Sequence, residues 1–151
     1  MTPNAKETPL TDIAAQLRMG IVRTARRLRQ EAATEATGLT PTSLSALATI
    51  DRHGPLTPSE LAKLERVQRP TVTRTLRCLE REGLVARTPD PADGRSSLVS
   101  VNAAGRERLR RLRGRKNAYL ARRMRDLPAA DVAALERAAE ILERMLEDER
   151  R

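Results

Sequence analysis

Threonine and arginine residues are concentrated in the ten residues RPTVTRTLRC, at positions 69–78. Arginine can pair bidentately with guanine or with phosphate, and threonine can hydrogen-bond either group or contact a thymine methyl. The stretch contains no acidic residue, and a carboxylate there would repel phosphate. Because β-branched threonines are mediocre helix formers, their presence calls for a reason other than helix stability. We therefore expect this stretch to contact an anionic partner.

The distribution of charge supports the same expectation. The chain of 151 residues carries a formal net charge of +9. Residues 126–151 contribute −4, so residues 1–125 contribute +13 and should meet the acidic partner. Nucleic acid is the first candidate and an anionic membrane surface is the second. Tyr119 is the single aromatic residue, which argues against recognition of single strands by base stacking.

Several classes of protein do not match this composition. No apolar run approaches the roughly 20 residues of a membrane-spanning helix, and the N-terminus lacks the apolar segment of a signal peptide. One cysteine excludes an internal disulfide framework and fits a reducing cytoplasm. A single histidine and a single cysteine do not make a tetrahedral zinc site without an unusual set of carboxylates. The sequence has no nucleophile–base pairing and no Gly-rich phosphate loop, so we expect a protein that is not an enzyme. We also expect it to be cytoplasmic and to hold no metal or cofactor.

Two near-repeats, LTPTSL at 39–44 and LTPSEL at 56–61, mark helix starts before the threonine- and arginine-rich stretch. Each places a threonine at the N-cap and a proline at the first helical position, where the missing N–H costs nothing. In the second repeat, Thr57 and Glu60 complete a capping box. The spacing predicts helices over 41–52 and 58–65.

The stretch itself predicts a further helix over 70–82. Pro70 marks the first helical position, and Val72, Leu76 and Leu79 form an apolar stripe that should face the core. Gly83 is expected to end the helix. The threonines, Thr75 included, and the arginines are then expected on exposed first turns.

A hairpin and two helices follow. The runs LVART at 84–88 and SLVSV at 97–101 are strand-like, and Asp93-Gly94 between them is a hairpin turn signal. Asn102 is a good N-cap for a helix over 103–125, and Pro128 opens the last helix.

Apolar side chains recur along the first and last helices. The first helix, over 10–36 and stopped by Gly38, carries one apolar face, and the last carries a heptad seam. Such faces call for partner helices, so we expect them to mediate dimerisation. The predicted positions are Ile13, Leu17, Val132, Leu135, Ala139, Leu142 and Leu146.

This order predicts a mainly α fold with a small β-wing. A winged helix-turn-helix lobe at 40–101 would be flanked by dimerisation helices at 10–36 and 103–149. In a helix-turn-helix the second helix enters the major groove, here residues 70–82, and the wing at 89–97 would enter a minor groove. The candidate DNA contacts are Gln68, Arg69, Thr71, Thr73, Arg74, Arg77, Asp93, Gly94, Arg95 and Ser96.

The chain resembles the MarR family of winged-helix transcriptional regulators over nearly all of its length. LTPSELAKLERVQRPTVTRTLRCLEREGLVAR resembles the family's helix-turn-helix block, and DPADGRSSLVSVNAAG resembles its wing segment. The resemblance implies an obligate homodimer with interlaced first and last two helices, and a response to small anionic or phenolic ligands or to oxidants. Gln68 departs from the family's usual serine N-cap, which leaves open what caps the recognition helix.

Two residues are candidates for sensing, each with a plainer alternative. Cys78 lies beside Arg77 and Arg81, which could favour its thiolate, or it is a small half-buried residue without a role. His53 could bind a ligand or respond to pH, or it interacts with a helix C-terminus. Residues 106–125 hold ten basic residues and one acid, which could flank DNA, line an anion pocket or form a solvated face.

We expect a sequence-specific, double-stranded DNA-binding regulator that acts as a homodimer on a pseudo-palindromic operator. Repression, and release by a small-molecule effector, are further expectations. The alternative is a non-specific architectural DNA-binding protein, which the high charge alone would also suit. A solvated arginine-rich helix remains the plainest interpretation of residues 69–78 taken alone.

Overall fold

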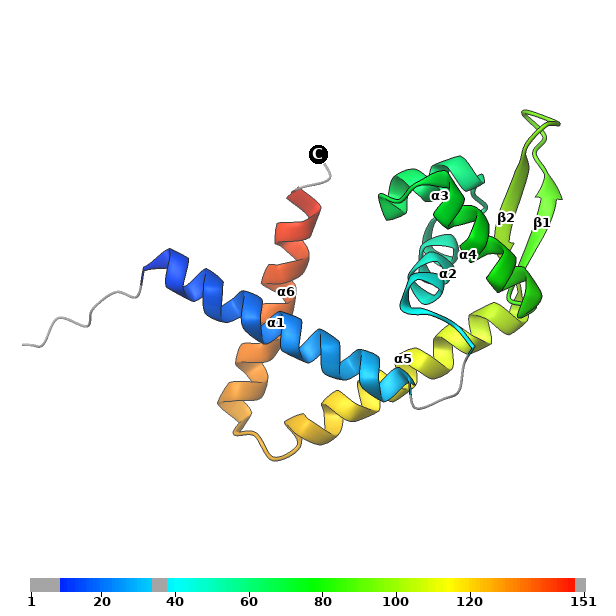
Figure 1. Cartoon of the computed structure of the whole chain (residues 1–151). Coiled ribbons are helices and arrows are strands. Elements are labelled where there is room, and N and C mark those ends of the chain that lie inside the picture. Colours follow the sequence, from blue (N-terminus) through cyan, green and yellow to red (C-terminus); the bar gives the residue numbers. More distant parts are fainter. Residues whose placement is uncertain (1–8, 34–37, 149–151) are drawn as a thin grey trace, which may run out of the picture. The chain divides into compact units, whose positions relative to one another are not determined.

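The structure is a computed structural model that describes residues 9–33 and 38–148. It confirms a mainly α fold with one small antiparallel sheet (Figure 1). The chain divides into two units, residues 1–116 and 117–151, with the boundary inside the fifth helix. The elements are α1 (Leu10–Ala33), α2 (Pro41–His53), α3 (Pro58–Glu65), α4 (Arg69–Arg81), β1 (Val85–Pro89), β2 (Ser97–Val101), α5 (Ala103–Met124) and α6 (Ala129–Asp148).

Most predicted boundaries are confirmed to within one residue. The predicted C-terminal end of the first helix, at residues 34–36, lies outside the described residues. The prediction that Pro70 occupies the first position of its helix is wrong, because α4 begins at Arg69 and Pro70 is second. Proline is tolerated at both positions, since the first four N–H groups of a helix have no partner within it.

The starts of α2 and α3 are capped as predicted. The Thr40 hydroxyl accepts a hydrogen bond from the Ser43 N–H at 3.1 Å. The Thr57 hydroxyl accepts from the Glu60 N–H at 3.2 Å, and the Glu60 carboxylate accepts from the Thr57 N–H at 2.8 Å. The backbone N–H of Thr57, and then its hydroxyl, hold the pKa of Glu60 below its ordinary value.

Helices α2, α3 and α4 share one apolar core with the hairpin. The stripe predicted on α4 is confirmed, because Val72, Leu76 and Leu79 are all buried. Burying each such side chain contributes about 1.5–3 kcal/mol. The largest fully buried side chains are Leu47, Ile50, Leu61, Leu76, Leu79 and Val99.

A carboxylate adds a polar tie beside this core. Glu65, the last residue of α3, accepts hydrogen bonds from the hydroxyls of Ser45, at 2.7 Å, and Thr49 on α2. Charge-assisted bonds of this kind are about twice as strong as neutral ones. The angle between α2 and α3 is therefore held by polar as well as apolar contacts.

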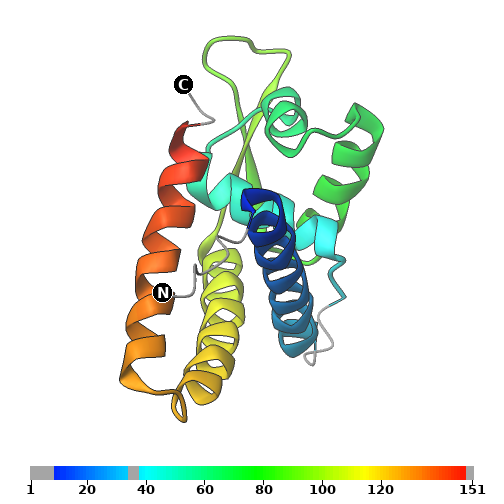
Figure 2. The ribbon, with the colours of Figure 1, turned by 90° about the vertical axis from the view of Figure 1, so that its left-hand side faces the viewer.

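The two strands form an antiparallel hairpin in which Val85 pairs with Val101 and Pro89 with Ser97. Leu56 pairs with Val99 through two backbone bonds, of 3.0 and 2.7 Å, which join the segment before α3 to the sheet. The tip of the hairpin projects past α3 and α4 (Figures 1 and 2). The hairpin therefore has a buried base and an exposed tip.

The end of α4 meets the start of α5 through Asn102 and Gly105. Asn102 caps α5 as predicted, because its side-chain oxygen accepts from the Gly105 N–H at 2.9 Å. Its amide also donates to the Gly83 carbonyl, at 2.8 Å, just beyond the end of α4. A Cβ at Gly105 would lie 2.2 Å from the Leu84 carbonyl oxygen, so only glycine allows this approach.

The second unit contains the end of α5 and the whole of α6. A turn joins the two helices, with the Leu127 N–H donating to the Met124 carbonyl at 3.1 Å. The Pro128 carbonyl accepts from the Val132 N–H at 3.1 Å, which starts α6 one residue after the predicted Pro128.

We expect Gly105→Ala to destabilise the folded chain by about 1–3 kcal/mol, because the added methyl overpacks against fixed backbone. Gly114→Ala in the same helix is the matched control, since its new Cβ would meet no described atom within 4 Å. That control should be neutral or stabilising by up to about 1 kcal/mol, because alanine favours helix. Urea unfolding of both variants measures the difference, and equal stabilities would contradict the close packing at Gly105.

Candidate nucleic-acid interface

The exposed face of α4 lies opposite its buried stripe. With 3.6 residues per turn, the positions farthest from the stripe carry a proline and three arginines. These residues are Pro70, Arg74, Arg77 and Arg81, and all are exposed. Thr73 is exposed beside them, and among the described residues neither Arg74 nor Arg77 forms an ion pair. The helix therefore presents guanidinium groups to an external partner.

One prediction for this helix is wrong. Thr75 was expected on the exposed face but is 7% exposed and belongs to the core side. It follows Val72 by three residues and precedes Leu79 by four, which places it on the buried stripe. Thr71 and Thr73 are exposed as expected.

The turn before α4 brings further basic residues together. Arg66 closes α3 in the left-handed conformation, with φ 53° and ψ 42°, which is uncommon for a residue other than glycine. A hollow of about 280 Å³ there is lined by Lys63, Arg66, Gln68 and Arg69 among others. Gln68 forms no side-chain capping bond with α4. The sequence did not single out Lys63, within the helix predicted over 58–65, or Arg66, directly after it.

Two hydrogen bonds constrain side chains at the start of α4. The Arg69 guanidinium donates to the Ser59 hydroxyl of α3 at 2.9 Å. The Thr73 hydroxyl donates to the Arg69 carbonyl, one turn earlier, at 3.1 Å. Arg69 is thus held toward α3, whereas Arg74 and Arg77 are not held in this way.

The tip of the wing is shaped by Asp93. Its carboxylate accepts from the Arg95 N–H at 3.0 Å, and its carbonyl accepts from the Ser96 N–H at 2.9 Å. Asp93 thus shapes the turn by bonding its backbone. Gly94 and the side chain of Arg95 are exposed, and Ser96 is half-buried.

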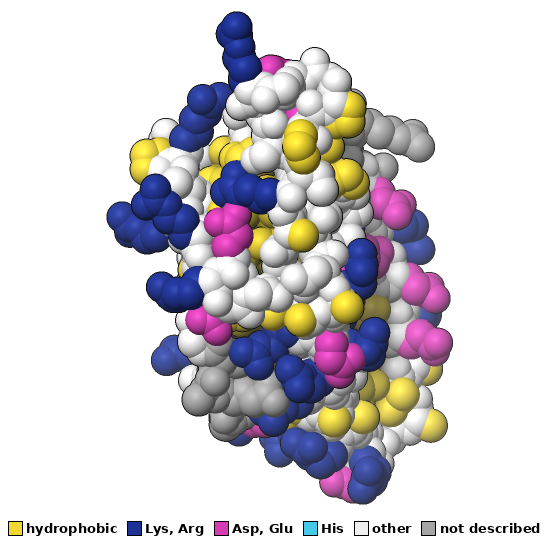
Figure 3. Space-filling view, turned by 90° about the vertical axis from the view of Figure 1, so that its right-hand side faces the viewer, with side chains coloured by type: hydrophobic (Ala, Val, Ile, Leu, Met, Phe, Trp, Pro, Cys, Tyr) yellow, Lys and Arg dark blue, Asp and Glu magenta, His cyan; other side chains and the backbone are white. Residues whose placement is uncertain are grey.

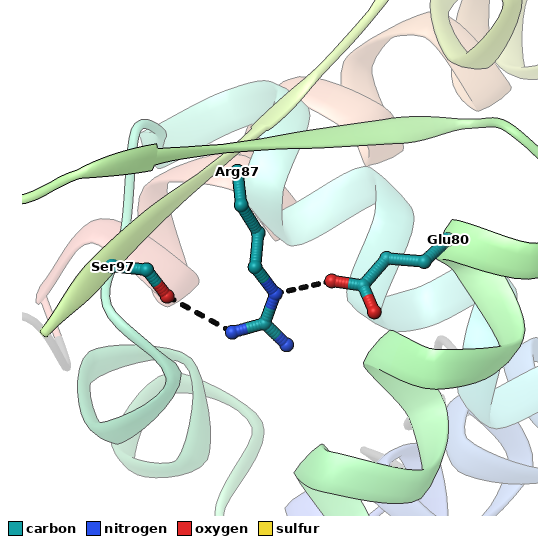
Figure 4. A network of polar contacts seen from close by, with 3 residues as sticks. All are labelled: Glu80, Arg87 and Ser97. Atoms are coloured by element: carbon teal, nitrogen blue, oxygen red, sulfur yellow. Dashed lines mark hydrogen bonds and ion pairs between the residues drawn. The ribbon is translucent and has the colours of Figure 1, made fainter.

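A polar network joins α4 to both strands of the wing (Figure 4). The Arg87 guanidinium of β1 forms an ion pair with Glu80 of α4 and donates to the Ser97 hydroxyl of β2 at 2.9 Å. Because side chains alternate along a strand, Arg87 shares a face with Val85, whose side chain is in the core. The network therefore joins the wing to α4 beside the core.

Sequence reasoning did not single out these three residues. Their positions, 80, 87 and 97, come from three different elements. The alternation of β1 gives one usable signal, since an arginine two residues after a buried valine must lie near the adjoining helix. Nothing in the sequence specifies which acid would meet it.

Basic side chains are scattered over the face that includes the wing (Figure 3). Figure 3 views the molecule from the side of the hairpin, where Lys and Arg side chains are spread over the surface. Basic side chains extend from the end where the hairpin tip lies. On α5, Arg110 pairs with Glu107, and Arg113 pairs with Asp51 of α2 at 3.1 Å. Part of the basic run on α5 is therefore neutralised locally.

The two candidate sensing residues lie apart from each other. Cys78 is half-buried on α4, and its Sγ lies 3.7 Å from an Arg81 guanidinium nitrogen. His53 is the exposed last residue of α2. Within residues 9–33 and 38–148, no group of three or more His, Cys, Asp or Glu side chains could hold a metal ion. No described helix is long and apolar enough to cross a bilayer.

Known proteins share this arrangement. The sequence model of the MarR family matches residues 39–97. An uncharacterized HTH-type transcriptional regulator of Mycobacterium bovis is 35% identical over 130 residues, which cover 86% of this chain and 90% of the relative. The crystal structure of a Pseudomonas aeruginosa protein superimposes with a TM-score of 0.79 at 35% identity, covering 92% of this chain and 98% of that one.

A second solved structure is itself described as a regulator. The transcriptional regulator from Thermotoga maritima has a TM-score of 0.77 at 26% identity, covering 91% of this chain and 96% of its own. The likeness thus extends over nearly the full length of this chain and of each of these relatives. The chain belongs to the MarR family of DNA-binding transcriptional regulators.

Proposed function

We propose that the chain binds double-stranded DNA at a specific sequence and represses transcription. The exposed arginine row on α4 carries this proposal, because the first turns of such a helix contact base edges in the major groove. Arg74 and Arg77 have the chemistry for guanine or phosphate. The proposed DNA contacts are Gln68, Arg69, Thr71, Thr73, Arg74, Arg77, Asp93, Gly94, Arg95 and Ser96.

The wing would contact a flanking minor groove. Its tip carries the exposed Arg95 on a tight turn shaped by Asp93. Arginine is attracted to narrow, A·T-rich minor grooves, where the negative potential is enhanced. The ion pair between Arg87 and Glu80 supports this role, since it joins the base of the wing to α4.

We propose that the lobe at 40–101 is carried on dimerisation helices at 10–36 and 103–149. Among the described residues, ten of the twelve large apolar side chains that are exposed lie on α1 or α6. Leu135 is 47% exposed and Leu146 is 50% exposed on the heptad seam of α6. A second copy would cover such faces, and a two-fold dimer would place two recognition helices about one helical turn (~10 bp) apart.

We propose that a small amphipathic anion releases the DNA. A hollow of about 380 Å³, within the size range of small-molecule sites, lies between the end of α1, the start of α2 and α5. Its walls include Leu39, Leu44 and Leu112, and Arg29 and Lys116 also line it. We also propose a cytoplasmic location, which a single cysteine suits.

A non-specific architectural DNA-binding protein is the competing function. Both functions release counterions, so the salt dependence of binding does not separate them. Sequence preference does, since specific binding is typically about 10³- to 10⁷-fold tighter than non-specific binding.

Selection from random duplexes tests the proposed function. The wild-type chain should enrich a pseudo-palindrome, and Arg74→Ala should cost about 1–3 kcal/mol and relax one base position per half-site. Arg95→Ala should instead lose only a flanking A·T preference, because the minor groove distinguishes little more than A·T from G·C. Selection of no motif by the wild type would favour the architectural alternative.

Dimerisation is tested by charge on the exposed seam of α6. Leu135→Glu should halve the mass measured by sedimentation equilibrium, because burying an unpaired carboxylate in an interface is costly. Leu64→Glu is the matched control, because Leu64 is 48% exposed on α3 and lies outside the proposed interface. The mass of this variant should remain that of a dimer. A monomeric wild type, or a Leu135→Glu variant that stays dimeric, would contradict the assignment.

Octanoate is a suitable probe of the hollow, because it combines an aliphatic chain with one negative charge. We expect millimolar octanoate to weaken binding to the selected operator about 10-fold, which corresponds to roughly 1.4 kcal/mol of differential affinity. Octylamine, with the same chain and the opposite charge, should have no such effect. Fluorescence anisotropy with labelled operator measures both, and an unchanged response in Lys116→Gln would remove the hollow from the proposal.

A further inference from the structure

Thr73 and Thr75 of α4 differ in which part of the side chain is exposed to solvent. Its hydroxyl donates to the Arg69 carbonyl at 3.1 Å, so its only proton is used within the helix. Thr75, by contrast, is in the core. Because Oγ1 is directed at the helix backbone, the methyl is the larger group left on the exposed side of Cβ. Thr73 therefore presents a methyl group beside the arginines of the exposed face.

The neighbouring side chain leaves this methyl accessible. Arg69 lies one helical turn before Thr73, where a long side chain could cover it. The Arg69 guanidinium is instead bonded to Ser59 on α3, at 2.9 Å. The next residue, Arg74, is exposed and forms no ion pair among the described residues. Thr73 is thus followed in sequence by an arginine that forms no ion pair among the described residues and is available for a base.

The fold itself gives no reason for threonine here. An exposed threonine within a helix is less favourable than alanine by a few tenths of a kcal/mol, and a bond to the preceding turn tends to bend the helix. An external contact with the methyl would account for the residue type. In the major groove, the apolar group that the bases display is the C5-methyl of thymine.

We propose that Thr73 determines specificity for one thymine in each half-site, through contact between its methyl and the C5-methyl of that base. The assignment rests on the proposed function and goes beyond it by naming the base and the group recognised. Arg74 and Arg77, farther round the same face, then take the polar edges of neighbouring base pairs.

Deoxyuridine tests the contact, because it lacks only the C5-methyl of thymidine. Each thymine of the selected operator is replaced singly, and binding is measured by competition. One replacement per half-site should weaken wild-type binding about 2- to 5-fold, as expected for one buried methyl group. Thr73→Val, which keeps a methyl but loses the hydroxyl, should show the same loss at the same base. Thr73→Ser, which loses the methyl, should bind the thymine and uracil operators equally.

Thr88→Ser is the matched control, because it removes a methyl from an exposed threonine of β1 whose side chain lies on the opposite face of the strand from Arg87. Its sensitivity to uracil should equal that of the wild type, and the thermal melts of all variants should coincide. The assignment is overturned if no thymine is sensitive, or if Thr73→Ser keeps the sensitivity of the wild type. It is also overturned if Thr73→Val loses the preference, which would show that the hydroxyl is recognised. Failure to select any motif would overturn the proposed function first, and this assignment with it.

Discussion

The burial of one stripe on α4 is the constraint on which the rest of the structure depends. Val72, Leu76 and Leu79 pack into the core that α2, α3 and the hairpin share. At about 1.5–3 kcal/mol for each buried side chain, this contact outweighs the small helical cost of the neighbouring threonines. Because the stripe fixes the rotation of α4, it also decides which residues face outward. Packing of the buried face therefore determines which side chains of α4 are available to a partner.

Polar contacts then fix what lies around this helix. Glu65 holds α2 to α3, Asn102 holds the end of α4 to the start of α5, and Arg87 holds both strands of the wing to α4. Each tie lies at an exposed or partly exposed position beside the core, so water screens it and its contribution to stability is modest. The proposed binding mode, with α4 in the major groove and the wing in the minor groove, needs both elements to contact one DNA together. The Glu80–Arg87 pair joins the base of the wing to α4.

Local signals predicted most of the fold, because caps, proline positions and apolar periodicity act within a few residues. They predicted the starts of α2 and α3 and the stripe on α4. The polar residue type of Thr75 suggested an exposed position, but helical geometry places it on the buried stripe of α4. The Arg87 network was not foreseen, since it joins residues from three elements. The left-handed conformation of Arg66 was not predicted either, because the residue that ends a helix in this conformation is usually glycine.

We propose that the arginine face of α4 lies in the major groove. Methylation interference tests it most directly, because dimethyl sulfate marks guanine N7 in the major groove and adenine N3 in the minor groove. On an operator bound by the full chain, methylated guanines should block binding in two clusters about 10 bp apart, one for each recognition helix. Interference confined to adenine N3, or spread evenly along the duplex, would contradict the account.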